Sequence, residues 1–189
     1  MIVKPKVRGF ICTTAHPVGC EAVVKSEIDY VKSKKAEDNG FKPKKVLVLG
    51  SSMGYGLASR ISLAFAGGAA TLGVMFDRPA SGNKTGTSGW YNTQAFEKYA
   101  KADGLYARTV NGDAYSDECK KEVIDIIKAD LGKVDCVVYS LAAPRRTVGD
   151  VTYSSVLKTT GEPYTNKTID LRNNTVSEVT IEPATEEEI

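Results

Sequence analysis

Three glycines in the pattern Gly50-x-x-x-Gly54-x-Gly56 are the residues whose spacing most directly predicts chemistry. They follow an apolar run at 46–49 and precede a helical pattern, so we expect a strand, a tight turn and a helix start. Gly50 would allow the turn, Gly54 would let backbone approach a phosphate, and Gly56 would let the helix pack close to the sheet. The unpaired N–H groups and the positive end of the helix dipole would then bind a pyrophosphate.

The surroundings of these glycines favour a dinucleotide. Their spacing resembles the short-chain dehydrogenase/reductase variant of the dinucleotide turn. A Walker A loop is excluded because no Gly-Lys-Ser/Thr follows. An apolar stripe of the following helix is formed by Leu57, Ile61, Ala64 and Phe65. The alternative is a glycine-rich turn that holds no ligand.

Strands and helices are predicted to alternate through the first three quarters of the chain. We expect helices at 21–35, 54–66, 92–103 (capped by Asn92) and 116–131 (capped by Ser116 and stopped by Gly132), strands at 46–50, 70–76, 105–110 and 134–140, a linker at 37–45 and a loop at 80–91. This order predicts right-handed crossovers and an α/β fold with a doubly wound parallel sheet of the Rossmann type.

The character of the sequence changes after Leu141. Residues 150–183 carry many Thr, Val and Asn, which predicts an extended or hairpin segment outside the sheet. Pro183 and Thr185 predict a helix start that the chain does not complete. We therefore expect an N-terminal helical extension at 1–45, a dinucleotide-binding core at 46–149 and an extended insertion at 150–189. Four strands are fewer than the six of a nucleotide fold, so we expect the N-terminal part of a larger enzyme.

Composition excludes several classes of function. The 189 residues carry a net charge of +2 without a basic block, which makes nucleic acid an unexpected partner. No apolar stretch has the length of a secretory signal core or a membrane span. The four cysteines form no Cys-x-x-Cys pair and there is one histidine, so we expect no metal site and a cytoplasmic location.

Asp77 follows the second expected strand, where an acid accepts hydrogen bonds from adenosine ribose hydroxyls in dinucleotide folds. A carboxylate repels a 2′-phosphate, so Asp77 predicts NADH rather than NADPH as the cofactor. The adjacent Arg78 opposes this preference, because arginine can accommodate that phosphate. The alternative for Asp77 is an ordinary acid in a turn before Pro79.

Two further pairs follow expected strands. Asp113 and Ala114 stand where short-chain reductases hold the adenine edge, although Asn111-Gly-Asp is also strong turn chemistry. Leu141 and Ala142 follow the fourth strand, and their backbone would line the ribose on the nicotinamide side.

Several separate stretches together resemble one family. They are residues 1–12, Ala15-His-Pro-Val-Gly-Cys20, Leu49-Gly-Ser-Ser-Met-Gly-Tyr-Gly-Leu-Ala-Ser-Arg60, Gly89-Trp-Tyr-Asn92, Asn111-Gly-Asp-Ala-Tyr-Ser116 and Val138-Tyr-Ser-Leu-Ala-Ala-Pro-Arg-Arg146. In this order they closely resemble the trans-2-enoyl-CoA reductases, also known as FabV-type enoyl-acyl-carrier-protein reductases, over essentially the whole chain.

The resemblance implies a monomeric, NADH-dependent enzyme that reduces the C2=C3 bond of a trans-2-enoyl thioester carried by coenzyme A or acyl-carrier protein. Phe76 would lie by the adenine and Asp77 would discriminate between cofactors. The cofactor-binding positions implied are Gly50, Ser51, Ser52, Met53, Gly54, Tyr55, Phe76, Asp77, Asp113, Ala114, Leu141 and Ala142.

The catalytic pair of the family has no counterpart in this chain. The family uses a Tyr and a Lys at Tyr-x8-Lys spacing, and no Tyr here has a Lys nine positions on. Tyr30 and Lys34 match the Tyr-x3-Lys of ordinary short-chain dehydrogenases, but they precede the glycine turn, which indicates coincidence. We expect residues 1–189 to bind nucleotide at most, with the rest of the same polypeptide supplying catalysis. The alternatives are a nucleotide-sensing module without chemistry and a short-chain ketoreductase, which needs a Ser together with a Tyr-x3-Lys, and residues 140–189 contain no Tyr-x3-Lys.

Three other groups have both structural and functional interpretations. His16 would border the active site or be structural. Trp90 and Tyr91 would wall the cofactor cleft or pack where a loop meets a helix. Arg145 and Arg146 would meet the phosphates of an acyl carrier or lie in a solvated turn.

Overall fold

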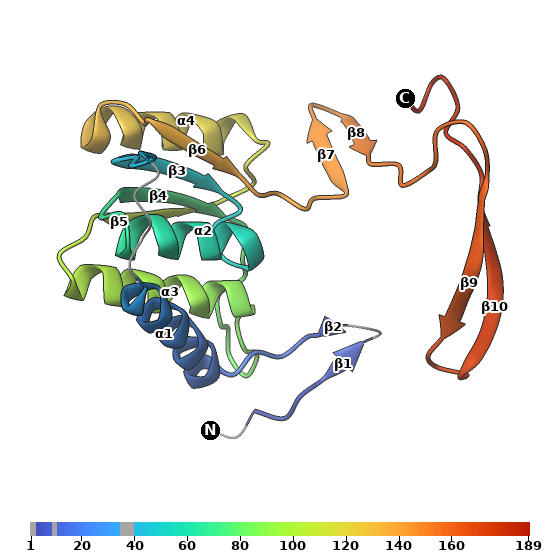
Figure 1. Cartoon of the computed structure of the whole chain (residues 1–189), viewed down its shortest axis with the longest axis horizontal. Helices are drawn as coiled ribbons and strands as arrows, with labels where there is room; N and C mark the ends of the chain where they lie inside the picture. The colour runs from blue at the N-terminus through green and yellow to red at the C-terminus, as the bar shows by residue number, and fades with distance from the viewer. Residues whose placement is uncertain (1–2, 9–10, 35–39) are drawn as a thin grey trace. The chain divides into compact units, whose positions relative to one another are not determined.

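Four apolar runs of the sequence form a parallel sheet with the strand order β5-β4-β3-β6 (Figure 1). In this computed structural model, which describes residues 3–8, 11–34 and 40–189, the strands are β3 Lys45–Leu49, β4 Ala70–Met75, β5 Ala107–Asn111 and β6 Cys136–Tyr139. Val46 lies between Thr71 of β4 and Cys136 of β6. The strand order reverses at β3, and ligands bind at this point in such sheets. The expected Rossmann-type α/β fold is confirmed.

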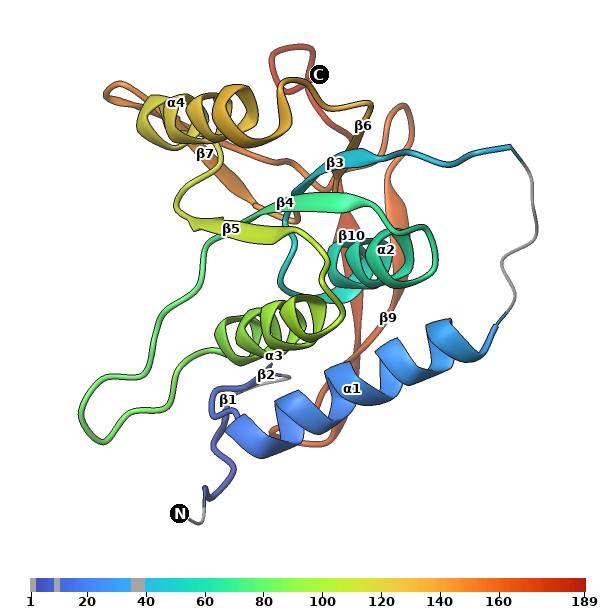
Figure 2. The same ribbon diagram turned by 90° about the vertical axis from the view of Figure 1, so that its left-hand side faces the viewer.

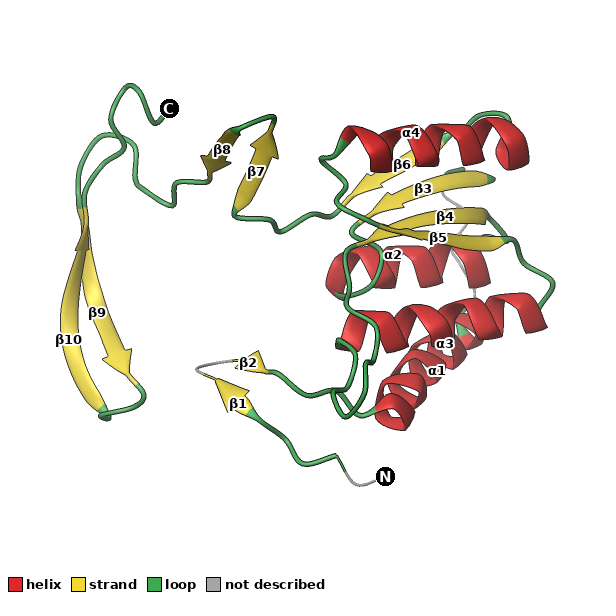
Figure 3. Cartoon of the chain, turned by 180° about the vertical axis from the view of Figure 1, so that it is seen from behind, coloured by secondary structure: helices red, strands yellow, loops and turns green. Residues whose placement is uncertain are grey.

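Helices cover both faces of the sheet. They are α1 Pro17–Ser33, α2 Gly54–Phe65, α3 Ser88–Ala102 and α4 Asp117–Ile126, which continues into the π-helical segment η1 Ile127–Leu131. Figure 3 shows α4 on one face of the sheet and α2 with α3 on the other. In Figure 2, α1 lies across α2 and α3, so these helices share an apolar core of their own.

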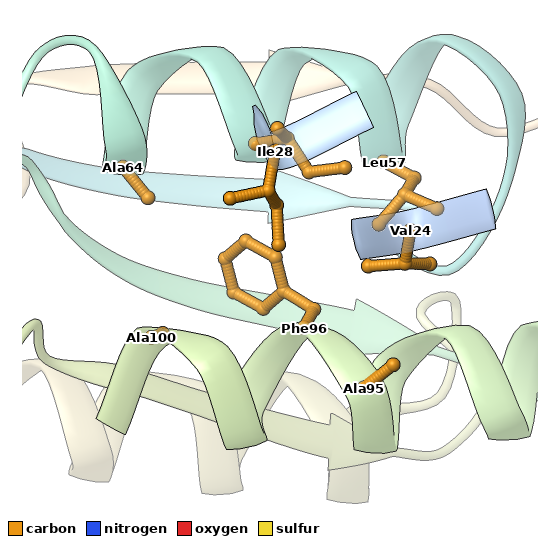
Figure 4. Close-up of a cluster of buried hydrophobic side chains, with 8 residues drawn as sticks. Val24, Ile28, Leu57, Ala64, Ala95, Phe96 and Ala100 are labelled. Atoms are coloured by element: carbon orange, nitrogen blue, oxygen red, sulfur yellow. The ribbon is translucent and has the colours of Figure 1, made fainter. Parts of the chain in front are cut away.

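The core between α1, α2 and α3 is centred on Phe96 (Figure 4). Its fully buried ring meets Phe65 edge to face, with the ring centroids 5.7 Å apart. The other members are Val24, Ile28, Leu57, Ile61, Ala64, Ala95 and Ala100. The apolar stripe expected on the helix after the glycines is therefore what attaches α2 to its neighbours.

Phe96→Ala is expected to lower the free energy of unfolding by about 3–5 kcal/mol, because it leaves a cavity at the meeting point of three helices. Urea denaturation followed by circular dichroism measures this change. Tyr30→Ala is the matched control, since the Tyr30 ring is 63% exposed and its removal should change stability by less than about 0.5 kcal/mol. Equal effects of the two substitutions would contradict this assignment of the core.

Two expected helix starts are wrong. α1 begins at Pro17 rather than at 21, because the His16 ring accepts a hydrogen bond from the Gly19 N–H and caps the helix four residues earlier. α3 begins at Ser88, inside the loop expected at 80–91, and Thr87 occupies the cap position. Asn92, expected as the cap, lies within the helix.

The caps of α4 are as expected, but its last turn is not. The Ser116 hydroxyl accepts from the Cys119 N–H, and Gly132 ends the element with a φ of +76°. Between them the helix widens to a π turn at η1, which nothing in the periodicity indicates. The expected linker at 37–45 and the end of the helix expected at 21–35 lie partly outside the described residues.

The second unit, Ala143–Ile189, consists of two antiparallel hairpins. One pairs β7 Arg145–Val148 with β8 Val151–Ser154, and the other pairs β9 Tyr164–Asp170 with β10 Thr175–Ile181. The expected hairpin character of this part is confirmed. A short hairpin of the first unit, β1 Val7–Arg8 with β2 Ile11–Cys12, precedes α1. At the tail, the Glu188 carboxylate accepts from the Thr185 N–H, which forms half of a capping box.

Candidate functional site

The glycine turn joins β3 to α2 at the carboxyl edge of the sheet. Gly50 has a φ of +80°, and a Cβ there would lie well under 3.0 Å from the Ser140 carbonyl oxygen of the neighbouring strand end. A Cβ on Gly56 would meet the Gly50 carbonyl oxygen equally closely. Gly54 has a φ of +53°, but apart from its chain neighbours and the nearby backbone of its own helix, no described atom lies within 4 Å of the position its Cβ would take. Gly50 and Gly56 are thus needed for packing, whereas Gly54 faces open space.

The amino end of α2 is open to a ligand. Met53 precedes the helix in an extended conformation and, among the described residues, makes no side-chain cap hydrogen bond. α1 and α4, by contrast, are capped by His16 and Ser116. The following Tyr55 is 88% exposed. Free N–H groups at a helix start with an open glycine beside them fit a phosphate.

The two serines of the turn have different roles. Ser51 is fully buried, and both its N–H and its hydroxyl donate to the Val74 carbonyl oxygen, at 2.9 and 3.2 Å. Ser51 therefore ties the turn to β4. The Ser52 carbonyl oxygen accepts from the Asn92 amide at 3.1 Å, so Ser52 ties the turn to α3.

Asp77 lies just beyond β4 beside a cavity of about 770 Å³. Its carboxylate accepts from the Thr87 hydroxyl at 2.7 Å. Its backbone exchanges two hydrogen bonds with the Asn111 amide, of 2.9 and 2.8 Å. Met53 and Arg78 line the same cavity, so the acid and the end of the glycine turn share one space.

The remaining expected positions also lie beyond strand ends. Phe76 follows β4 and is 80% exposed. Asp113 sits in a turn after β5, where its carboxylate accepts from the Tyr115 N–H at 2.9 Å, as the turn interpretation expects. Ala114 and Leu141 line a second, apolar cavity of about 380 Å³ beside α4. Ala142 follows Leu141 and is exposed.

A buried arginine beneath the turn was not expected. Arg60 of α2 is fully buried and stacks on the Phe96 ring, with its guanidinium carbon 4.3 Å from the centroid. It donates to the Thr109 hydroxyl and the Arg108 carbonyl oxygen, both at 2.8 Å, and to the Thr71 hydroxyl at 3.1 Å. Burial lowers the pKa of Arg60 to about 10, so the group stays protonated at neutral pH.

Gly73 of β4 makes room for this arginine. A Cβ there would lie under 3.0 Å from both the Arg60 guanidinium and the Ser51 hydroxyl. Arg60 thus lies directly beneath the residue that ties the glycine turn to the sheet.

The remaining residues that the sequence singled out lie in ordinary helix caps, loops and strands. His16 caps α1, and the Tyr91 hydroxyl accepts from the Gly86 N–H at 2.9 Å where the loop meets α3. Tyr30 lies exposed on α1. Arg145 and Arg146 lie exposed on strand β7, so of the two alternatives the solvated turn is wrong, and contact with the phosphates of an acyl carrier stays a prediction.

Two cysteines line the cavity beside Asp77. Hydrogen bonding to Thr14 lowers the pKa of Cys12, whereas burial raises the pKa of Cys20. The two thiols of this cavity therefore differ in acidity.

Comparison with known proteins assigns the family. The model described as "Trans-2-enoyl-CoA reductase catalytic region" matches residues 84–189, and "NAD(P)H binding domain of trans-2-enoyl-CoA reductase" matches residues 2–82. The chain belongs to the trans-2-enoyl-CoA reductase family. Within this family, it is 60% identical to the trans-2-enoyl-CoA reductase [NADH] of Ruminiclostridium cellulolyticum and 62% identical to an enoyl-[acyl-carrier-protein] reductase [NADH] of Burkholderia vietnamiensis.

Solved trans-2-enoyl-CoA reductases share the fold. The Treponema denticola enzyme in complex with NAD superposes with a TM-score of 0.88 at 49% identity, over 100% of this chain and 48% of that one. The Clostridium enzyme in complex with NADH gives 0.85 at 41% identity, over 100% and 47%. Both curated relatives are likewise matched over 100% of this chain and over 48% and 47% of their own lengths. The chain thus spans about half the length of the relatives it matches.

No helix in the described part of the chain combines the length and the apolar character needed to cross a membrane.

Proposed function

We propose that this chain is the cofactor-binding half of an NADH-dependent enoyl thioester reductase. The observation that carries the proposal is the convergence of an open, glycine-lined helix start with Asp77 at one edge of a Rossmann-type sheet. Relatives at about 60% identity are named as NADH-dependent reductases, and solved relatives hold NAD or NADH, which supports the same cofactor here.

The residues present fit a dinucleotide. The open space over Gly54 and the free start of α2 would take the pyrophosphate, and Asp77 would accept from the adenosine ribose hydroxyls. Within the turn, Gly50 and Ser51 would act by holding its shape, because their N–H groups already donate to Val74. We further propose that the site includes Ser52, Met53, Tyr55, Phe76, Asp113, Ala114, Leu141 and Ala142.

The reaction explains why half of the site would suffice for binding but not for turnover. When bound, the nicotinamide would supply a hydride to C3 of the enoyl thioester. Negative charge then builds on the thioester oxygen, which needs a hydrogen-bond donor, and C2 needs a proton. A Tyr with its pKa lowered by a Lys suits this task, and we propose that the rest of the polypeptide supplies both.

The remaining features of the proposal concern the whole protein. We propose an acyl thioester of coenzyme A or acyl-carrier protein as substrate, a monomeric enzyme and a cytoplasmic location. We also propose that 1–45 acts as an extension of the core, 46–149 as the dinucleotide-binding core and 150–189 as an insertion leading to the catalytic half.

Titration with NADH and NADPH tests the cofactor assignment. The chain is expected to bind NADH at least about tenfold more tightly than NADPH, because a carboxylate at Asp77 repels a 2′-phosphate. Asp77→Asn should bring the two dissociation constants to within about twofold of each other by removing that charge. Asp150→Asn, which changes an exposed acid of the second unit, should leave the ratio unchanged.

Three outcomes would overturn parts of this proposal. Tighter binding of NADPH would mean that Arg78 outweighs Asp77. Sustained oxidation of NADH with crotonyl-CoA by residues 1–189 alone would show that catalysis does not need a Tyr and Lys from elsewhere. A parent reading frame without Tyr-x8-Lys would instead favour the nucleotide-sensing alternative.

A further inference from the structure

The start of α3, from its cap residue Thr87 to Asn92, touches both parts of the proposed nucleotide site. Thr87 and Gly89 lie against Asp77, whereas Asn92 and Ser88 lie against the glycine turn. The sequence predicts a role in binding within this segment only for the aromatic pair Trp90-Tyr91. The two family models also divide here, between residues 82 and 84, so that Asp77 and its partner Thr87 fall on opposite sides of the division.

The Thr87 hydroxyl holds the Asp77 carboxylate in place. It lies 2.7 Å from Asp77 Oδ1, a distance typical of a hydroxyl donating to a charged acceptor. As an acceptor it receives the Arg78 N–H at 3.2 Å, while the Thr87 N–H donates to the Arg78 carbonyl oxygen at 3.0 Å. The Arg78 carbonyl oxygen is a second acceptor within reach of this hydroxyl, at 3.3 Å, but the shorter distance and the charge of the carboxylate favour donation of its single hydrogen to Asp77.

Gly89 and Asn111 restrain the same acid from other sides. A Cβ on Gly89 would lie 2.5 Å from both Asp77 carboxylate oxygens, so the carboxylate occupies space that only glycine leaves free. The Asn111 amide holds the backbone of Asp77 through two hydrogen bonds. The carboxylate is therefore preorganised before any nucleotide arrives.

Asn92 and Ser88 act on the other part of the site. The Asn92 amide donates to the Ser52 carbonyl oxygen at 3.1 Å, and the Ser88 hydroxyl lies 3.3 Å from Met53 Sδ. These contacts hold the turn that would bind the pyrophosphate, which NADH and NADPH share. The ribose 2′ position, where the two nucleotides differ, is the one that Asp77 would read.

We propose that Thr87 is a specificity-determining positioning residue, which sets the preference for NADH over NADPH by orienting Asp77. This inference rests on the proposed function, because it assumes that the site takes a nicotinamide dinucleotide. Near the same end of α3, Asn92 sets affinity for both nucleotides without changing the preference. The start of α3 thereby separates selectivity from affinity.

The test compares Thr87→Val, Thr87→Ser and Asn92→Ala in the complete 189-residue chain, with dissociation constants for NADH and NADPH from calorimetric titration. Thr87→Val keeps the side-chain shape and removes the donor, and it should lower the NADPH-to-NADH ratio of dissociation constants about tenfold. Thr87→Ser keeps the hydroxyl and should leave the ratio within about twofold of the unmodified chain. Asn92→Ala should weaken the binding of both nucleotides by a similar factor and leave the ratio of the two dissociation constants unchanged.

If Thr87→Val weakens the binding of NADH and NADPH equally, the residue has only a structural role, and this result would overturn the inference. If Thr87→Val does not fold, Gly89→Ala probes the same carboxylate, because its methyl group would displace Asp77; it would also press on the Ser52 hydroxyl, so the readout is the ratio of the two dissociation constants rather than either affinity alone. It should lower the ratio as well, and an unchanged ratio in this variant would also count against the inference. Failure of the unmodified chain to bind either nucleotide would contradict the proposed function itself, which is a different result.

Discussion

Gly56→Ala is expected to destabilise the first unit by about 3 kcal/mol or more, because the added methyl group would overlap the Gly50 carbonyl oxygen. The atom it meets is backbone of the glycine turn, which cannot rotate away as a side chain can. To relieve this overlap, α2 must move away from the sheet or the turn must open. Either change removes the arrangement that would bind a pyrophosphate. Thermal unfolding by circular dichroism and titration with NADH together measure both losses.

Gly54→Ala is the informative partner of this variant. It carries a cost of about 1–2 kcal/mol for a left-handed conformation, but outside its chain neighbours and the nearby backbone of its own helix it meets no described atom within 4 Å. The variant should fold, yet lose at least about tenfold in affinity for NADH, since the methyl group stands where the phosphate would approach. If Gly54→Ala binds as tightly as the unmodified chain, the phosphate does not approach at Gly54. If Gly56→Ala remains as stable as the unmodified chain, the close packing of α2 is not required.

The sheet could be predicted because each strand is recognisable from its own residues. Strands buried on both faces are continuous apolar runs, and 46–49 and 70–76 read this way without any knowledge of their partners. The start of α3 could not be predicted in the same way. Asn92 is the better cap by residue type, but the helix begins earlier because Asp77 and Ser52 pack against Gly89. The π turn at η1 is similar, since the Leu131 carbonyl there accepts from Lys45, which lies far away in the sequence.

The residues of the candidate site also differ in whether their roles could be predicted from the sequence. Asp77 was expected because strand ends are predictable and an acid there has a known use. Thr87 was not, because its role depends on a loop bringing it back beside Asp77. Arg60 did leave a signal: it shares helical spacing with Leu57, Ile61 and Ala64, so a charge falls on an apolar stripe. Gly73 within an apolar strand is a second signal, of close approach by another group.

Arg60→Met is also expected to destabilise the chain strongly. Methionine fills part of the space but donates no hydrogen bonds, so the Arg108 carbonyl oxygen and the hydroxyls of Thr71 and Thr109 lose a buried partner. We expect a loss of about 3 kcal/mol in the free energy of unfolding. Arg60→Lys should recover only part of it, since one ammonium cannot reach both strands with the geometry of a guanidinium.

Arg108→Met is the matched control for this variant. Its side chain is half exposed and pairs with Asp130 at 3.1 Å, so its loss should cost less than about 1 kcal/mol, and its carbonyl oxygen would still accept from Arg60. Urea midpoints separate the two variants. Similar midpoints would show that the Arg60 network adds nothing beyond a surface ion pair. Because the Arg60 guanidinium and the Ser51 hydroxyl both lie against Gly73, we expect a change at Arg60 to reach the glycine turn, so that Arg60→Met should weaken NADH binding under conditions where the chain is still folded.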